Sequence, residues 1–140
     1  MAEHEPTIIA FVCNWCTYTA ADLAGTSRLI YPPNVRLIRM MCTGMVDPKY
    51  VIKAFLEGAD AVLISGCHPG DCHYINGNYK ARRRVKLLKE ILPRFGFDES
   101  RLKLTWIGAS EGVDFAEIIR EMVAEIKKIG PTEVREQMVL

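Results

Sequence analysis

The chain has 140 residues, of which 49% are hydrophobic and 25% are charged, and its formal net charge at pH 7 is +1. This length is enough for one domain with its own hydrophobic core, and the near-neutral charge gives no reason to expect nucleic acid or an anionic membrane as a partner. The apolar runs are strand-sized and too short to cross a bilayer. The acidic start, MAEHEP, lacks the basic and apolar parts of a secretory signal, so we expect a cytoplasmic protein.

Four short apolar segments predict buried β-strands. They are residues 7–12, 35–41, 59–65 and 102–107. Each segment is rich in Val, Ile or Leu, as strands covered by helices on both faces must be.

Helical patterns follow each of these strands, over residues 19–30, 47–57, 78–95 and 110–129. Asp47 is a suitable N-cap with Pro48 at the first helical position, and Gly58 suits the C-terminal cap of the same helix. In the last helix the predicted buried face consists of Val113, Ala116, Ile119, Val123 and Ile126.

The alternation of strand and helix predicts an α/β fold. We expect a single three-layer domain over residues 1–130, with a mostly parallel four-stranded sheet flanked by helices, of the Rossmann or flavodoxin-like class. Residues 131–140 begin with proline and mix charged with apolar side chains, and we expect a C-terminal tail there. Docking of this tail on a partner is a hypothesis.

Five cysteines lie at or just beyond the predicted strand ends. Cys13, Cys42 and Cys67 directly follow the first three strands, while Cys16 and Cys72 lie in the loops after Cys13 and Cys67. Neighbouring parallel strands are about 4.8 Å apart and end at the same edge of the sheet, so these thiols can reach one small ligand. In the cytoplasm, clustered thiols indicate metal binding or redox chemistry more often than disulfides.

The cysteine spacings favour an iron–sulfur cluster. Cys13 and Cys16 form a C-x-x-C pair, and Cys67 and Cys72 form a C-x-x-x-x-C pair. Such clusters are held by cysteine thiolates, usually four, and backbone amides of glycine-containing loops supply hydrogen bonds to sulfur. We therefore predict a cluster that is held by four of the five cysteines. The flanking His68 and His73 are interpreted as hydrogen-bond donors or plain loop residues rather than ligands.

Two other functions stay open at this point. A C-x-x-C pair between a strand and a helix is also typical of thiol–disulfide oxidoreductases, in which Cys13 and Cys16 would be the redox pair. Structural zinc would be satisfied by four cysteines as well, although a chain with a full hydrophobic core has little need of it. A cysteine phosphatase is excluded, because no arginine stands six residues after Cys13, Cys42 or Cys67. Nucleotide-binding glycine motifs are absent too.

A basic run and several aromatic residues are expected near the same edge of the sheet. The basic run is Lys80, Arg82, Arg83 and Arg84, and the aromatic residues are Trp15, Tyr74 and Trp106. A solvated helix face explains such a basic run, and a docking patch for an acidic redox partner is the functional interpretation.

Three sequence motifs resemble the delta subunit family of methyl-viologen-reducing hydrogenase. They are FVCNWCTYTAADLAG, RMMCTGMVDP and SGCHPGDCHYINGNYKARRRV, and the resemblance runs from residue 8 to residue 129. It implies one 2Fe–2S cluster, with Cys13, Cys16, Cys42, Cys67 and Cys72 as candidate ligands and one thiol to spare.

The resemblance also implies a place in a hetero-oligomeric complex. Family members connect a nickel–iron hydrogenase, with its small and large subunits, to heterodisulfide reductase in methanogenesis. Electrons from H2 would pass through this chain to the flavin-containing A subunit of the reductase, where flavin-based electron bifurcation occurs. The chain would then be an electron-transfer subunit of an oxidoreductase complex and not a catalyst by itself.

Overall fold

The computed structural model of the chain describes residues 5–68, 70 and 76–132. Its strands are β1 (Ile8–Cys13), β2 (Val35–Met40), β3 (Ala61–Gly66) and β4 (Leu102–Trp106). Its α-helices are α1 (Thr17–Thr26), α2 (Pro48–Leu56), α3 (Gly77–Ile91) and α4 (Gly112–Ile129), and three short 3-10 helices are η1 (Thr43–Met45), η2 (Leu92–Phe95) and η3 (Glu99–Arg101). None of the helices within these ranges is long and apolar enough to cross a membrane.

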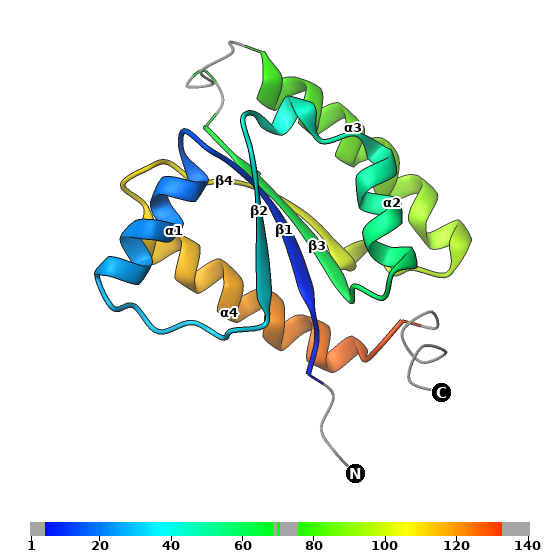
Figure 1. Ribbon diagram of the computed structural model, residues 1–140. Coiled ribbons are helices and arrows are strands. Elements are labelled where there is room, and N and C mark those ends of the chain that lie inside the picture. The colour runs from blue at the N-terminus through cyan, green and yellow to red at the C-terminus, as the bar shows by residue number, and fades with distance from the viewer. Residues whose placement is uncertain (1–4, 69, 71–75, 133–140) are drawn as a thin grey trace.

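The four strands form one sheet in the order β2-β1-β3-β4, and every neighbouring pair is parallel (Figure 1). After β1 the chain adds β2 on one side and then returns to add β3 on the other side. The strand order therefore reverses at the β1–β3 boundary, which is where open α/β sheets leave a crevice for ligands. The predicted fold class is confirmed, and the sheet is parallel throughout.

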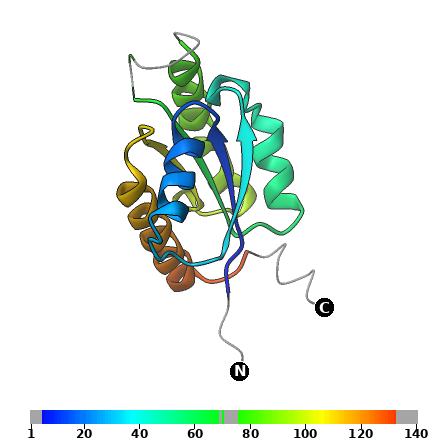
Figure 2. The same cartoon turned by 60° about the vertical axis from the view of Figure 1, so that its left-hand side comes forward.

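Helices cover both faces of the sheet, with α1 and α4 on one face and α2 and α3 on the other (Figures 1 and 2). Side chains of a strand alternate between the faces, so Ala10 of β1 packs with the first pair of helices and Phe11 with the second. The largest buried side chains on the two sides are Phe115 of α4 and Phe55 of α2, neither of which is exposed at all.

The predicted capping residues of α2 are confirmed. Asp47 is the N-cap, and its carboxylate accepts a hydrogen bond from the backbone N–H of Lys49 at 2.9 Å. Pro48 is the first helical residue, where a missing N–H costs nothing. Gly58, two residues past the helix, has a φ of 101°, a conformation that favours glycine.

Several helix boundaries differ from the sequence-based expectation, by up to four residues. Helix α1 ends at Thr26, four residues earlier than expected, and α4 begins at Gly112, two residues later. Val113 was predicted to be buried, but it is 56% exposed. It lies in the first turn of α4 and faces away from the sheet, while the adjoining core position is filled by Phe115.

Strand β2 is not covered on both faces, so that expectation was wrong. It is the edge strand of the sheet, and all six of its residues are at least partly exposed. Helix α2 contacts β3 and leaves a groove between itself and the β1–β2 half of the sheet. Ile38, in the middle of β2, is therefore 41% exposed.

Candidate metal centre

The carboxyl ends of β1 and β3 bring three sulfur atoms together. Cys13 is the last residue of β1, Cys67 directly follows β3, and Cys16 directly precedes α1. The sulfur atoms of Cys13 and Cys67 are 3.7 Å apart, and those of Cys16 and Cys67 are 2.6 Å apart. These three thiols therefore meet at the point where the strand order reverses, as their positions in the sequence predicted.

Of the other two cysteines, the structure describes only Cys42. Cys42 is buried and caps η1, where its sulfur accepts a hydrogen bond from the backbone N–H of Gly44 at 3.4 Å. The preceding residue, Met41, offers its carbonyl oxygen to the Cys13 thiol at 3.9 Å, so the end of β2 adjoins the sulfur site. Cys72 lies outside the described residues, as do His4, His73 and Tyr74.

A buried chain of hydroxyl groups fixes the segment that carries Cys16. Thr105 donates to Ser65 at 3.0 Å, Ser65 and Thr17 are 3.1 Å apart, and Thr17 donates to the carbonyl of Ile107 at 3.3 Å. The chain joins the first residue of α1 to the ends of β3 and β4. Each bond contributes about 0.5–1.5 kcal/mol, and together they hold Cys16 against Cys67.

The start of α3 fixes the backbone around Cys67. The side-chain amide of Asn78, which is almost fully buried, donates to the carbonyl oxygens of Cys67 and His68 at 3.3 and 3.1 Å. The segment that leaves β3 is thus attached to α3, which begins ten residues further along the chain, so α3 helps to orient Cys67.

Arg84 fixes the segment that carries Cys42. Its guanidinium donates to the carbonyl oxygens of Gly44 and Val46, which flank the end of η1. Gly44 also lies against α3, since a Cβ atom built on it would be only 2.9 Å from the Cα of Gly77. This close approach requires glycine, and Arg84 secures the segment from the side.

The basic run on α3 is therefore smaller than predicted. Arg84 faces the η1 segment, while Lys80, Arg82 and Arg83 are exposed, as is Lys86 on the next turn. Their use as a docking patch stays a prediction.

His68 is held by a carboxylate on the neighbouring loop. Its Nε2 atom makes a short contact with Glu111, whose carboxylate also accepts the backbone N–H of Gly108 at 2.8 Å. The hydrogen bond from His68 is the main reason that the pKa of Glu111 is lowered, and the N–H of Gly108 adds to the effect. The sequence indicated Glu111 only as a helix start, whereas it also orients the residue next to Cys67.

The surroundings of Cys13 favour its protonated form. Burial raises the pKa of this thiol, and the neighbouring sulfur of Cys67 raises it further. The backbone N–H groups of Trp15 and Cys16 act in the opposite direction and are outweighed. Cys13 is therefore a neutral thiol at pH 7, and a cation that binds there has to displace its proton.

The sulfur positions fit a thiolate-bound metal in part. A tetrahedral ion with bonds of about 2.3 Å holds two sulfurs roughly 3.8 Å apart, which agrees with the 3.7 Å between Cys13 and Cys67. Cys16 lies too close to Cys67 to share such an ion in its present side-chain position. In keeping with this, no group of three or more His, Cys, Asp or Glu side chains within the described ranges is arranged to hold a metal ion. The donor chemistry fits a cluster, while its geometry is incomplete.

Apolar side chains surround the sulfur site and face solvent. Trp15, Met41 and Met45 are 40%, 44% and 55% exposed, and a hollow of about 460 Å³ lies beside Met41, Cys42 and Met45. Trp106 ends β4 at the same edge of the sheet, as expected. Exposed apolar side chains around a site are typical of a surface that meets another protein.

Comparison with known proteins gives the family. Residues 8–130 match the family described as methyl-viologen-reducing hydrogenase, delta subunit. The chain belongs to this family. It is 51% identical over 129 residues to the iron-sulfur D subunit of the F420-non-reducing hydrogenase of Archaeoglobus profundus, and the match covers 92% of this chain and 94% of the relative.

Two further relatives show the family in two contexts. The iron-sulfur D subunit of the F420-non-reducing hydrogenase vhc of Methanococcus voltae is 50% identical over 137 residues, which are 97% of this chain and 95% of the relative. The A subunit of the ferredoxin/F(420)H(2)-dependent CoB-CoM heterodisulfide reductase of Methanosarcina acetivorans is 49% identical over 126 residues, which are 90% of this chain but only 16% of that protein. The same domain therefore occurs both as a separate protein and within a longer reductase subunit.

The sequence did not predict which polar residues hold the segments of the site in place. They are Thr17, Ser65, Asn78, Arg84 and Glu111. Each bonds to a group far away in the chain, so no spacing pattern marks it. One signal was available, because Ser65 is a polar residue at the end of an otherwise apolar strand and two positions before a cysteine.

Proposed function

We propose that the chain is an electron-transfer subunit that binds a 2Fe–2S cluster at the carboxyl edge of its sheet. The convergence of Cys13, Cys16 and Cys67 at the β1–β3 boundary carries the proposal. Cys42 and Cys72 are the other candidate ligands, and four of the five would be used. When bound, such a cluster accepts and releases single electrons.

The protein's part is to hold the thiols and control their surroundings. The hydroxyl chain through Thr17 and Ser65 fixes the segment of Cys16, and Arg84 fixes the segment of Cys42. The N–H groups of Trp15 and Cys16 face the sulfur of Cys13 and favour its thiolate. Loading of the site releases the proton of Cys13, so loading is favoured as the pH rises.

The partners follow from the relatives. Relatives are named as subunits of F420-non-reducing hydrogenase, and in another relative the same domain is part of the A subunit of heterodisulfide reductase. We propose that this chain relays electrons from the hydrogenase large and small subunits to the flavin-containing A subunit, which is the branch point of flavin-based bifurcation. A domain found both free and fused to the A subunit is suited to a permanent position beside it.

The relay can be tested by reconstitution. The A subunit is mixed with the hydrogenase subunits under H2, with and without this chain, and the reduction of the flavin is followed by its absorbance. We expect flavin reduction only when the chain with its metal bound is present. Equal reduction without the chain, or none with it, would contradict the relay.

A thiol–disulfide function is the second candidate, and the structure changes its residues. The closest sulfur pair within the described ranges is Cys16 and Cys67, at 2.6 Å, rather than the C-x-x-C pair of Cys13 and Cys16. Thiol titration and peptide mapping after mild oxidation test this function. A reversible Cys16–Cys67 disulfide in a chain without metal would favour the oxidoreductase over the electron relay.

A further inference from the structure

The outer edge of β2 is open, and its backbone groups are arranged in a row. The backbone N–H of Ile8 donates to the carbonyl of Asn34, and that of Asn14 donates to the carbonyl of Met40. The even-numbered residues of β2 therefore direct their backbone groups toward β1. Successive residues of a strand point their backbone groups to opposite sides. Val35, Leu37 and Arg39 therefore direct their N–H and C=O groups outward, where no described strand pairs with them.

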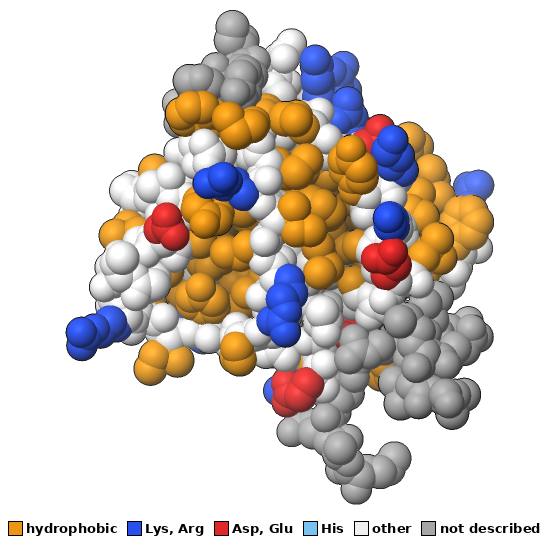
Figure 3. Space-filling model, viewed as in Figure 1, with side chains coloured by type: hydrophobic (Ala, Val, Ile, Leu, Met, Phe, Trp, Pro, Cys, Tyr) orange, Lys and Arg blue, Asp and Glu red, His pale blue; other side chains and the backbone are white. Residues whose placement is uncertain are grey.

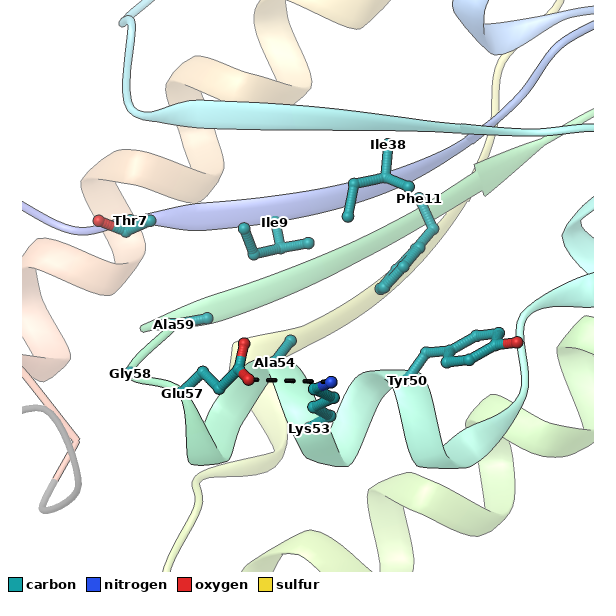
Figure 4. A pocket seen from close by; sticks show the side chains of 10 residues that line it. All are labelled: Thr7, Ile9, Phe11, Ile38, Tyr50, Lys53, Ala54, Glu57, Gly58 and Ala59. Carbon is teal, nitrogen blue, oxygen red and sulfur yellow. Dashed lines mark ion pairs between the residues drawn. The ribbon is translucent and has the colours of Figure 1, made fainter.

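An apolar groove lies beside this edge. It has a volume of about 380 Å³, and its floor is formed by Ile9 and Phe11 of β1 and Ile38 of β2. Figure 4 shows these three side chains pointing toward α2, where Tyr50 and Ala54 form the opposite wall. Figure 3 shows apolar side chains exposed over this part of the molecule, between β2 and α2.

The charges around the edge are mostly positive. Arg36 and Arg39 extend from opposite faces of β2 and are exposed, and no acidic side chain pairs with either one in the described part of the chain. Lys53 stands on the opposite wall of the groove and pairs with Glu57, while the ammonium of Lys49 lies over the ring of the wall residue Tyr50. An occupant of this site would therefore need negative charge beside its apolar residues.

We propose that β2 accepts an extended segment of the A subunit as a fifth strand of the sheet. The outward backbone groups bind the main chain of that segment, the groove takes its apolar side chains, and the two arginines pair with acidic ones. This inference rests on the proposed function, because it takes the partner from there. It adds the surface and the mode of recognition.

A second copy of this chain fits the edge less well. Pairing of two β2 strands would place Arg36 and Arg39 of one copy close to the same residues of the other. Like charges that face each other across a strand pair are destabilising, and nothing acidic on β2 offsets them. An acidic segment from another protein avoids this repulsion.

Hydrogen exchange tests the pairing residue by residue. The full-length chain, purified with its metal, is compared alone and in complex with the purified A subunit of the same organism. We expect exchange at Val35, Leu37 and Arg39 to slow by roughly tenfold or more on binding, while Ile38, already bonded to β1, changes little. Unchanged exchange at the three outward amides would overturn the proposal.

Substitutions on β2 test the same edge by affinity. Proline is tolerated on an edge strand where its nitrogen faces outward, so Arg39→Pro removes one outward donor and leaves the β1 pairing in place. We expect it to weaken binding about tenfold relative to Arg39→Gln, which removes the charge alone. Ile38→Glu puts a charge into the groove and should weaken binding to a similar extent. Ile129→Glu on α4 is the matched control, because Ile129 is 37% exposed and Ile38 is 41% exposed, and it should leave binding unchanged.

The readouts separate this inference from the proposed function. Iron content and flavin reduction by the unmodified chain report on the electron relay, while the affinities of these variants report on the edge. Equal binding by Ile38→Glu and Ile129→Glu would overturn the inference and leave the relay standing. A loss of self-association in Ile38→Glu, with unchanged binding to the A subunit, would assign the edge to a second copy and overturn the inference as well.

Discussion

The carboxyl edge of the sheet and the open flank of β2 differ in how they are built. At the carboxyl edge, Cys13, Cys42 and Cys67 are almost fully buried, and side chains of α1, β3 and α3 hold their loops. At the flank, Ile38, Arg36 and Arg39 are exposed, and within the described residues the backbone of β2 is bonded on one side only. Contacts within the chain hold the first region, whereas the outward backbone groups of the second have no strand partner among the described residues.

This difference predicts two separable functions. Changes to the thiols at the carboxyl edge should remove the metal and leave binding of the A subunit unchanged, whereas changes at the flank should weaken that binding and leave the metal in place. The connection between the two is β1, which supplies Cys13 at its end and Phe11 to the groove.

Removal of a central thiol should abolish metal binding. Cys67 lies within contact of both Cys13 and Cys16, so Cys67→Ser should lower the iron content at least about tenfold. The affinity for the A subunit should change by less than about twofold, because the flank is untouched. Iron analysis and calorimetry measure the two effects, and a parallel loss of both would refute the separation of the regions.

A methyl group at Gly44 should displace the segment of Cys42. The added Cβ would lie 2.9 Å from the Cα of Gly77, a backbone atom that cannot turn away as a side chain could. We expect a loss of about 1–3 kcal/mol in the free energy of unfolding and a weaker hold on the metal. Gly25→Ala in α1 is the control, since its added Cβ meets nothing within 4 Å. This substitution should raise the free energy of unfolding by roughly 0.5–1 kcal/mol.

Arg84 should matter for stability, although it belongs to a run of basic residues. Arg84→Gln removes two hydrogen bonds to the η1 segment and should cost about 1–2 kcal/mol in denaturant unfolding. The exposed neighbour provides the comparison, because Arg83→Gln should change stability by less than about 0.5 kcal/mol. Equal effects would mean that the bonds of Arg84 are not made in solution.

The exposed basic residues of α3 predict a weaker effect on association. If they attract an acidic partner, Arg83→Glu slows complex formation at low salt, and the difference fades as ionic strength shortens the screening distance below about 8 Å. Iron content should stay the same. Association rates measured at two salt concentrations decide this, and a salt-independent change would exclude simple attraction.

Asp98 is a reference site away from both regions. Its pKa is lowered, first by the hydroxyl of Ser100 and then by the N–H of Ser100, both of which donate to its carboxylate. A carboxyl group whose pKa is lower in the folded state stabilises the protein above its unfolded pKa of about 3.9 and loses that stabilisation as the pH falls through the folded value. Because solvent screens this exposed group, Asp98→Asn should lower the free energy of unfolding by at most about 0.5 kcal/mol at pH 7 and by less at pH 3. Denaturant unfolding at the two pH values measures this difference. The iron content and the affinity for the A subunit should not change.

The sequence predicted the strands and the shared edge of Cys13, Cys16 and Cys67 because local patterns carry them. Apolar runs mark buried strands, and residues that follow parallel strands meet at one edge. The two exposed faces of β2 were not predictable from the same patterns, since Val, Leu and Ile occur in edge and central strands alike. Only the position of α2 over β3 leaves β2 uncovered.

The residues that support the cysteine loops could not be predicted from the sequence, for a different reason. Thr17, Asn78 and Arg84 act through hydrogen bonds to groups between 10 and 90 positions away in the chain. Such bonds depend on how loops fold back onto helices, and they leave no periodicity. In the sequence Arg84 resembles its exposed neighbour Arg83. The two differ only because η1 lies beside Arg84 and accepts its hydrogen bond.

The metal content of the purified chain decides whether the thiols at the carboxyl edge hold a 2Fe–2S cluster. The chain is purified without oxygen, its iron and acid-labile sulfide are measured, and the dithionite-reduced protein is examined by EPR. We expect about two irons and two sulfides per chain, with an EPR signal from a single unpaired electron. Zinc, or a chain without metal that forms a reversible Cys16–Cys67 disulfide, would contradict this expectation.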